Sequence, residues 1–260
     1  MAPSKPADLT MVVPTYNERD RLGELTDALF AACAAHRVDL ELVIVDDNSP
    51  DGTGQIADEL ARTRRMTVIH RAGKQGLGTA VVAGFAAASS DIVGVMDADF
   101  SHPPALVPRM LKVFEATKAD VLVASRYVPG GSTPDWPLMR RIMSRSACLA
   151  ARPLSPIRDA ASGFFLIRRS IAQGVAIKAG GFKICLELLV RAWPTRIVEI
   201  PYRFDDRELG ESKMSFKEAA GYLFQLKDLL VVRLATRGRP SREYRRLSAA
   251  EVDAIVQAAR

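Results

Sequence analysis

Residues 93–104 read VGVMDADFSHPP, an apolar run that ends in two aspartates. The run after Asp91 is typical of a buried strand, and Asp97 and Asp99 follow where that strand must end. Because alternate residues of an extended chain point to the same side, the two carboxylates are expected to converge on one point. A divalent cation with oxygen ligands would offset their repulsion, and an ordinary acidic loop is the alternative.

Further strand patterns alternate with helical patterns along the chain. The strands are expected at about residues 9–14, 40–45, 66–69, 120–124, 164–167 and 196–202. Alternating strands and helices predict an α/β fold, a mostly parallel sheet with helices on both faces. Ligands of such sheets lie beyond the carboxyl ends of the strands. The loops at 14–18, 46–52 and 96–99 are expected to meet there.

Composition excludes several classes of protein. With 260 residues, 48% of them hydrophobic, the chain can bury a substantial core. Its three cysteines form no C-x-x-C pair, which argues against a disulfide framework and against structural zinc. No secretory signal or transmembrane helix is expected. Neither a P-loop motif nor a dinucleotide fingerprint occurs, so those enzyme classes are disfavoured.

Two later segments combine basic and apolar residues. Arg140 and Ser144 lie one helical turn apart, so a helix could present a guanidinium and a hydroxyl together, or a solvated basic face. Residues 215–235 are typical of an amphipathic helix that lies in a membrane interface or packs on the domain. Beyond them, clustered arginines suit an anionic partner, with solubility as the alternative: Arg233, Arg237, Arg239, Arg242, Arg245 and Arg246. They lack interleaved aromatic residues, so no nucleic-acid binding is expected.

Five short motifs occur in order between about residues 9 and 235. They are VPTYNE at 13–18, VDDNSPDGT at 45–53, MDAD at 96–99, SRY at 125–127 and GESK at 210–213. The ordered set resembles the dolichol-phosphate (polyprenol-phosphate) mannose synthase family, inverting GT-A glycosyltransferases of glycosyltransferase family 2. That resemblance divides the chain into a GT-A domain at 8–213, an amphipathic interface helix at 214–236 and a basic C-terminal tail at 237–260.

The resemblance also implies the site residues. Nucleotide-sugar binding is expected at Pro14, Tyr16, Glu18, Val45, Asp47, Asp97, Ala98, Asp99, Arg126, Arg207 and Lys213. Mg²⁺ or Mn²⁺ is expected at Asp97, Asp99 and Ser101, and the acceptor phosphate at Arg126, Arg140 and Ser144. Asp99 and Arg126 are the expected catalytic residues. Ser101 stands where several relatives have Gln, and Phe165 where many have Arg.

The implied reaction is the metal-dependent transfer of mannose from GDP-mannose to a polyprenyl or dolichyl phosphate. A phosphate monoester is mostly dianionic at pH 7, so this nucleophile needs no dedicated base. Loss of Arg126 is expected to depress turnover with little effect on folding. The enzyme is expected at the cytoplasmic face of a membrane as a peripheral protein, and a separate membrane-anchoring subunit is left open. The alternatives are transfer of another sugar, such as glucose from UDP-glucose to undecaprenyl phosphate, and a catalytically silent nucleotide-sugar-binding protein.

Overall fold

The computed structural model describes residues 5–177, 183–205, 216–236 and 238–259. These residues form an eight-stranded sheet of order β3-β2-β1-β4-β6-β5-β7-β8. The strands are β1 (Leu9–Thr15), β2 (Leu40–Asp46), β3 (Met66–His70), β4 (Ile92–Val95), β5 (Val121–Ser125), β6 (Phe165–Arg168), β7 (Arg196–Pro201) and β8 (Glu243–Arg246). Only the two pairs that include β6 are antiparallel within this sheet. The predicted mostly parallel α/β sheet is confirmed.

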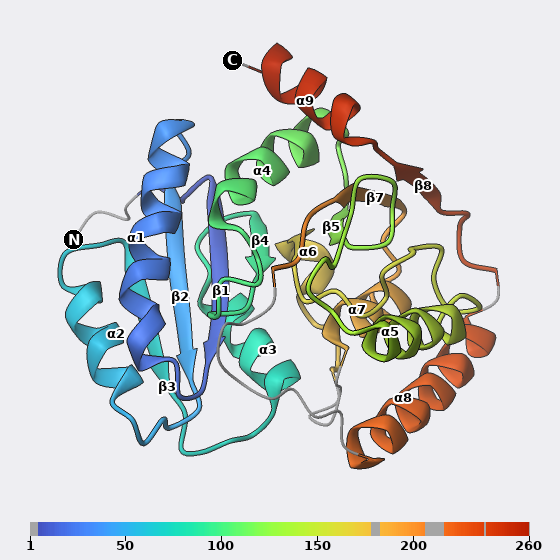
Figure 1. Cartoon of the computed structure of the whole chain (residues 1–260), viewed down its shortest axis with the longest axis horizontal. Helices are drawn as coiled ribbons and strands as arrows, with labels where there is room; N and C mark the ends of the chain where they lie inside the picture. Colours follow the sequence, from blue (N-terminus) through green and yellow to red (C-terminus); the bar gives the residue numbers. More distant parts are fainter. Residues whose placement is uncertain (1–4, 178–182, 206–215, 237, 260) are drawn as a thin grey trace.

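Helices cover both faces of the sheet (Figure 1). They are α1 (Arg19–Ala35), α2 (Thr53–Ala61), α3 (Leu77–Ala87), the 3-10 turn η1 (Pro104–Leu106), α4 (Val107–Ala116), α5 (Leu138–Ala150), α6 (Arg169–Ala172), α7 (Ile184–Arg191), α8 (Phe216–Ala235) and α9 (Ala249–Ala258). None of the helices within the described ranges combines the length and apolarity that a membrane crossing needs.

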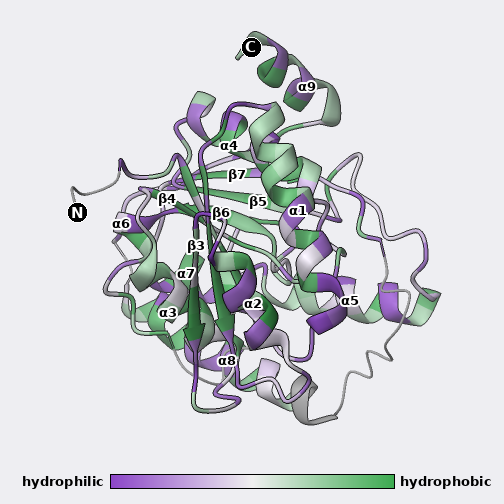
Figure 2. Cartoon of the chain, turned by 90° about the vertical axis from the view of Figure 1, so that its left-hand side faces the viewer, coloured by the Kyte–Doolittle hydropathy of each residue, from purple (hydrophilic) through white to green (hydrophobic). Residues whose placement is uncertain are grey.

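Two hydrophobic cores lie on opposite faces of the sheet, because side chains alternate along each strand. Met11 and Val13 of β1 belong to the core that includes α1 and α4, whereas Val12 belongs to the core that includes α3 and α7. In Figure 2 the strands between these helices are mostly green, the hydrophobic end of the scale. The strands are thus buried on both sides, and their carboxyl ends are held at fixed positions.

Gly94 lets β4 lie at the centre of this sheet. A Cβ atom at this position would overlap the side chains of Met11 and Leu166 on the two neighbouring strands. Since β4 leads directly into Asp97, this close packing fixes where the acidic loop begins.

The segment expected as a basic C-terminal tail, 237–260, contains a strand and a helix in its described part. Strand β8 pairs in parallel with β7, and the hydroxyl of Tyr244 donates to Glu199 Oε2 at 2.5 Å. Helix α9 begins with a capping box formed by Ser248 and Glu251. Val252 of α9 lies in the hydrophobic core. This segment therefore extends the sheet and adds to the core.

Candidate functional site

The loops after β1, β2 and β4 lie side by side, because β1 pairs in parallel with both β2 and β4. Asn17 and Asn48, in the first two loops, have left-handed backbones with φ of 60° and 58°. The N–H of Asn17 donates to Ser49 Oγ at 3.1 Å, and that of Glu18 to Thr53 Oγ1 at 2.9 Å. These hydrogen bonds hold the first two loops together at one edge of the sheet.

The nucleotide-sugar residues predicted in the first half of the chain gather at the ends of these strands. Pro14 and Val45 are register partners on β1 and β2. The Tyr16 ring is 40% exposed, and Lys74 Nζ lies 4.3 Å from its centroid. Asp47 directly follows β2. The structure therefore brings together the predicted residues Pro14, Tyr16, Glu18, Val45 and Asp47.

Arg71 pairs with Asp47 and was missing from the predicted site. Its Nη1 lies 2.6 Å from Asp47 Oδ1, and both side chains are nearly buried. The guanidinium also donates to the hydroxyl of Thr79 at 2.5 Å and to the carbonyl of Gly76 at 3.2 Å. Arg71 directly follows β3, which pairs with β2. Its place directly after a predicted strand is the sequence signal that could have identified Arg71 as a site residue.

Asp97 presents its carboxylate at the surface of the acidic loop. Its side chain is 39% exposed, and its backbone N–H donates to His102 Nδ1 at 3.0 Å. His102 Nε2 lies 3.9 Å from Asp97 Oδ2, so the imidazole ring is close to both the backbone N–H and the carboxylate of Asp97. The loop is thereby folded back on the histidine.

His102 is not among the site residues predicted from the sequence. In the structure it is 2% exposed and stacks on Phe164, with 4.8 Å between ring centroids. Burial lowers the pKa of His102, although Asp97 and Asp99 act to raise it. Because Nδ1 accepts a hydrogen bond from the backbone, the neutral ring carries its proton on Nε2. His102 is a positioning residue for the acidic loop.

Asp99 is more deeply placed than Asp97. It is 4% exposed, and its Oδ1 accepts hydrogen bonds from the backbone N–H and hydroxyl of Ser101, at 3.0 and 2.6 Å. Ala98, between the two acids, is buried. The carboxylate of Asp99 is therefore oriented by Ser101, which itself is only 1% exposed.

Arg126 forms a buried ion pair with Asp159. Its Nε and Nη2 donate to the two carboxylate oxygens, each at 2.7 Å, and its backbone N–H donates to Oδ2 at 2.9 Å. Asp159 is 0% exposed. Loss of Arg126 would leave a buried carboxylate unpaired, so from the structure we expect its removal to destabilise the fold as well as to depress turnover.

Two aromatic side chains connect Arg126 to the other predicted acceptor residues. The guanidiniums of Arg126 and Arg140 lie 5.2 and 4.0 Å from the ring centroid of Trp136. The hydroxyl of Tyr127 donates to Ser144 Oγ at 2.7 Å. The structure therefore brings Arg126, Arg140 and Ser144 into one neighbourhood.

A further aromatic contact joins the acidic loop to this basic group. Phe204 contacts His102 on one side and Trp136 on the other, with centroids 6.1 and 5.2 Å apart. Lys183 was not predicted as a site residue. Burial lowers its pKa, as does Arg126, while Asp159 and Asp97 act to raise it. Acids and cations from separate elements thus converge, whereas the predicted Arg207 and Lys213 lie outside the described residues.

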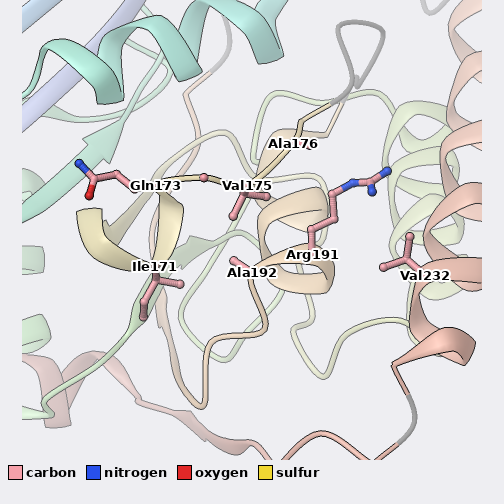
Figure 3. A pocket seen from close by; sticks show the side chains of 8 residues that line it. Ile171, Gln173, Val175, Ala176, Arg191, Ala192 and Val232 are labelled. Atoms are coloured by element: carbon pink, nitrogen blue, oxygen red, sulfur yellow. The ribbon is translucent and has the colours of Figure 1, made fainter.

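A cleft of about 420 Å³ lies elsewhere, between residues 171–176 and α8 (Figure 3). Arg191 is the charged side chain among the described residues that line it. Its guanidinium pairs with Glu187 and Asp228. None of the predicted site residues that the structure describes lines this cleft, and the charge of Arg191 is balanced by its two partners.

The chain is similar in sequence to known proteins. A family model described as Glycosyl transferase family 2 matches residues 10–182. The chain is 38% identical over 219 residues to the dolichol-phosphate mannosyltransferase of Pyrococcus furiosus, covering 83% of this chain and 61% of that protein. It is 39% identical over 236 residues to the dolichol-phosphate mannosyltransferase of Saccharomyces cerevisiae, covering 86% and 87%.

A solved structure shares the fold. It is glucosyl-3-phosphoglycerate synthase from Mycobacterium tuberculosis in complex with Mn²⁺, uridine diphosphate and phosphoglyceric acid. The TM-score is 0.60 at 21% identity, over 90% of this chain and 80% of that one.

Proposed function

The chain belongs to glycosyl transferase family 2, and we propose that it transfers mannose from GDP-mannose to a polyprenyl or dolichyl monophosphate with inversion. The observation that carries this proposal is the convergence of the acidic loop and the basic group on Phe204. One side of this site suits a cation with a diphosphate, and the other suits a second phosphate. The names of the two curated relatives point to the same reaction.

Asp97 and Asp99 fit a divalent cation of the Mg²⁺ or Mn²⁺ type. One carboxylate is partly exposed and the other is oriented by Ser101. No group of three or more His, Cys, Asp or Glu side chains in the described part of the chain is arranged to hold a metal ion. The pair of Asp97 and Asp99 suits a cation that takes one or two carboxylates from the protein and further oxygens from substrate phosphates. When bound, such an ion would offset the negative charge that develops on the leaving diphosphate.

The acceptor phosphate lies in the proposed site near Arg126, Arg140 and Ser144. One phosphate oxygen attacks the anomeric carbon of mannose from the face opposite the leaving group, and the bond from that carbon to the diphosphate breaks. Because the acceptor is already an anion, no side chain has to remove a proton. The arginines instead reduce the repulsion between the two phosphate groups.

Two buried polar atoms beside this basic group support a ligand there. Trp136 Nε1 and the Tyr202 hydroxyl are buried without a hydrogen-bond partner among the described residues. Both rings contact Phe204. An unpaired buried donor costs about 1–3 kcal/mol, which a phosphate or sugar oxygen would offset.

We place the membrane contact on α5 and α8. The two helices are joined where the hydroxyl of Tyr222 donates to the carbonyl of Ala147 at 2.9 Å. They expose large apolar side chains, a pattern typical of interfacial helices: Leu138, Met139, Ile142, Leu149, Leu223, Phe224 and Val231. We propose peripheral contact with the cytoplasmic leaflet, and vesicle binding by the purified chain tests whether a separate anchoring subunit is needed.

A transfer assay tests the function. Purified protein is incubated with radiolabelled GDP-mannose, a polyprenyl phosphate and Mg²⁺ or Mn²⁺, and labelled lipid is extracted. We expect labelled mannosyl phosphate lipid, no product in a chelator, and loss of product in Asp99→Asn. A parallel reaction with UDP-glucose tests the donor.

Three results would contradict parts of this proposal. Transfer of glucose without transfer of mannose would show that the donor is UDP-glucose and not GDP-mannose. Full activity in a chelator would exclude the metal. Binding of GDP-mannose without turnover, for every lipid phosphate tried, would support a silent nucleotide-sugar-binding protein.

A further inference from the structure

Four arginines of the described residues line a second cleft, of about 540 Å³, and none of the proposed catalytic residues lies there. Its walls are residues 152–156 after α5, Trp193 after α7, Arg233 of α8, and residues 238–242 before β8. Figure 1 shows the connection from α8 to β8 at the right-hand edge of the molecule, away from α1 and α2. Of the arginines singled out in the sequence, this cleft gathers Arg233, Arg239 and Arg242 and adds Arg152.

Trp193 is the centre of this cluster. The guanidinium carbons of Arg242, Arg233 and Arg239 lie 3.5, 4.5 and 5.4 Å from the centroid of its ring. The indole is fixed, since its N–H donates to the carbonyl of Pro240 at 3.1 Å. Its backbone has φ of 57°, an uncommon conformation for a bulky residue. Three cations are thus held around one aromatic ring.

Neutral groups hold these arginines in place. Arg242 donates to the carbonyl of Leu189 at 2.6 Å, and Arg239 donates to the carbonyl of Arg191 at 3.2 Å. Arg152 donates to the carbonyl of Pro156 at 2.8 Å. No acidic side chain occurs among the described residues that line the cleft. Among the described lining residues nothing balances this positive charge, whereas Arg191 in the cleft of Figure 3 is paired with two carboxylates.

Arg242 is buried beside two other arginines. Burial lowers its pKa to about 10, with Arg233 and Arg239 contributing in the same direction. Its Nε is buried without a hydrogen-bond partner among the described residues. Cation–π contacts stabilise each guanidinium, but they do not remove the repulsion between the guanidiniums. A bound anion would reduce that repulsion.

We propose that this cleft binds a phosphate group. Guanidinium forks match phosphate oxygens with pairs of parallel hydrogen bonds, and arginine is less strongly hydrated than lysine. The exposed apolar side chains of Leu149, Val231 and Leu234 lie on the two helices that lead into the cleft. A phosphate carried by a membrane phospholipid would reach the cleft from the surface that those helices present. A soluble phosphate would reach the same cations from solution.

Vesicle binding separates these two sources. The probes are vesicles of neutral phosphatidylcholine, vesicles with about one third phosphatidylglycerol, and inorganic phosphate at constant ionic strength. The test variant is Arg233→Gln/Arg239→Gln. The matched control is Arg37→Gln/Arg62→Gln, which loses the same charge from two exposed arginines that follow α1 and α2. Melting temperatures check that each variant is folded, and Arg239→Glu, at an exposed position, replaces the test variant if it is not.

For a lipid phosphate, wild type and control should prefer the anionic vesicles, and the test variant should bind them at least about tenfold more weakly. Binding to neutral vesicles should not change. For a soluble phosphate, inorganic phosphate should change the tryptophan fluorescence of wild type and control saturably. That signal should be absent in the test variant and in Trp193→Phe.

Equal anionic-lipid preference and equal phosphate response in wild type, control and test variant would overturn the proposal. An equal loss of binding in the control and the test variant would also overturn the proposal, because binding would then depend on net charge alone. The binding experiments use no sugar donor, so their outcome is independent of the outcome of the transferase assay.

Discussion

Asp159 holds the guanidinium of Arg126 where neither charge is well exposed to water; their side chains are 0% and 8% exposed. Burial acts to raise the pKa of Asp159, but the Arg126 guanidinium and its hydrogen bonds lower this pKa by a larger amount. The net shift of the pKa is therefore downward. The carboxylate therefore stabilises the fold fully above its unfolded pKa, near ~3.9, and this contribution is lost as pH falls through the lower folded pKa.

Asp159→Asn should lower the free energy of unfolding at neutral pH by about 3–5 kcal/mol, because Arg126 would stay buried without its counter-charge. Urea unfolding measures this, and the gap to wild type should narrow below the unfolded pKa. The control is Asp39→Asn, which breaks the partly exposed pair with Arg65 and should cost less than about 1 kcal/mol. Equal losses in the two variants would contradict the assignment of a buried pair.

His102→Phe should reduce mannosyl transfer by about tenfold or more. The phenyl ring keeps the contact with Phe164 but leaves the Asp97 N–H without its acceptor. His102→Asn should recover part of this loss, because its side-chain oxygen can take the place of Nδ1. The measurement is kcat together with melting temperature. If Phe and Asn variants lost activity equally at matched stability, the positioning role would be rejected.

Sequence reasoning reached some of these residues and missed others for a physical reason. Asp97 and Asp99 follow an apolar run, so their place at a strand end could be predicted from local pattern. The partner of Arg126 lies 33 positions away, and the ring that holds Asp97 belongs to a histidine with no local signal. Such roles arise only when separate elements pack together.

At the scale of elements, the packing of α3 against β1 depends on Gly84. A Cβ at this position would overlap the side chain of Val12, whereas a Cβ at Gly23 of α1 would meet nothing within 4 Å. Both glycines lie inside helices, where alanine has the higher helix propensity. Only at Gly84 would the added methyl group overlap a neighbour, so the two alanine substitutions are expected to have opposite effects on stability.

Gly23→Ala should stabilise the protein by about 0.5–1 kcal/mol through helix propensity. Gly84→Ala should instead destabilise it by about 1–3 kcal/mol, because either Val12 or the helix must move. Chemical denaturation of the two variants measures both signs. Stabilisation by both would show that α3 does not pack tightly on β1.

The helices were easier to predict than the last strand. The apolar pattern at 215–235 and the capping box at Ser248 are local signals, and α8 and α9 occur there. Strand β8 reads EYRR, which lacks an alternating apolar pattern. It is a strand because β7 offers a free edge, and that edge is visible only in the folded sheet.

At the scale of the whole molecule, three buried thiols report on opening of the domain. Cys33, Cys148 and Cys185 lie on α1, α5 and α7. Burial raises the pKa of Cys33 and Cys148 to about 12 and also raises that of Cys185.

Ellman's reagent at about pH 8 should therefore modify none of them in the folded protein and all three after unfolding in guanidinium, because the thiolate is the reactive form. The absorbance of the released thiolate counts the modified cysteines. Rapid modification of one cysteine in the native protein would show that its helix opens separately from the rest.

The chain leaves the sheet after β7, forms α8 and returns to the sheet as β8, the parallel neighbour of β7. Strand β8 therefore covers a backbone edge of β7 that would otherwise be open. Cutting the chain before β8 would expose this edge to pairing with other molecules.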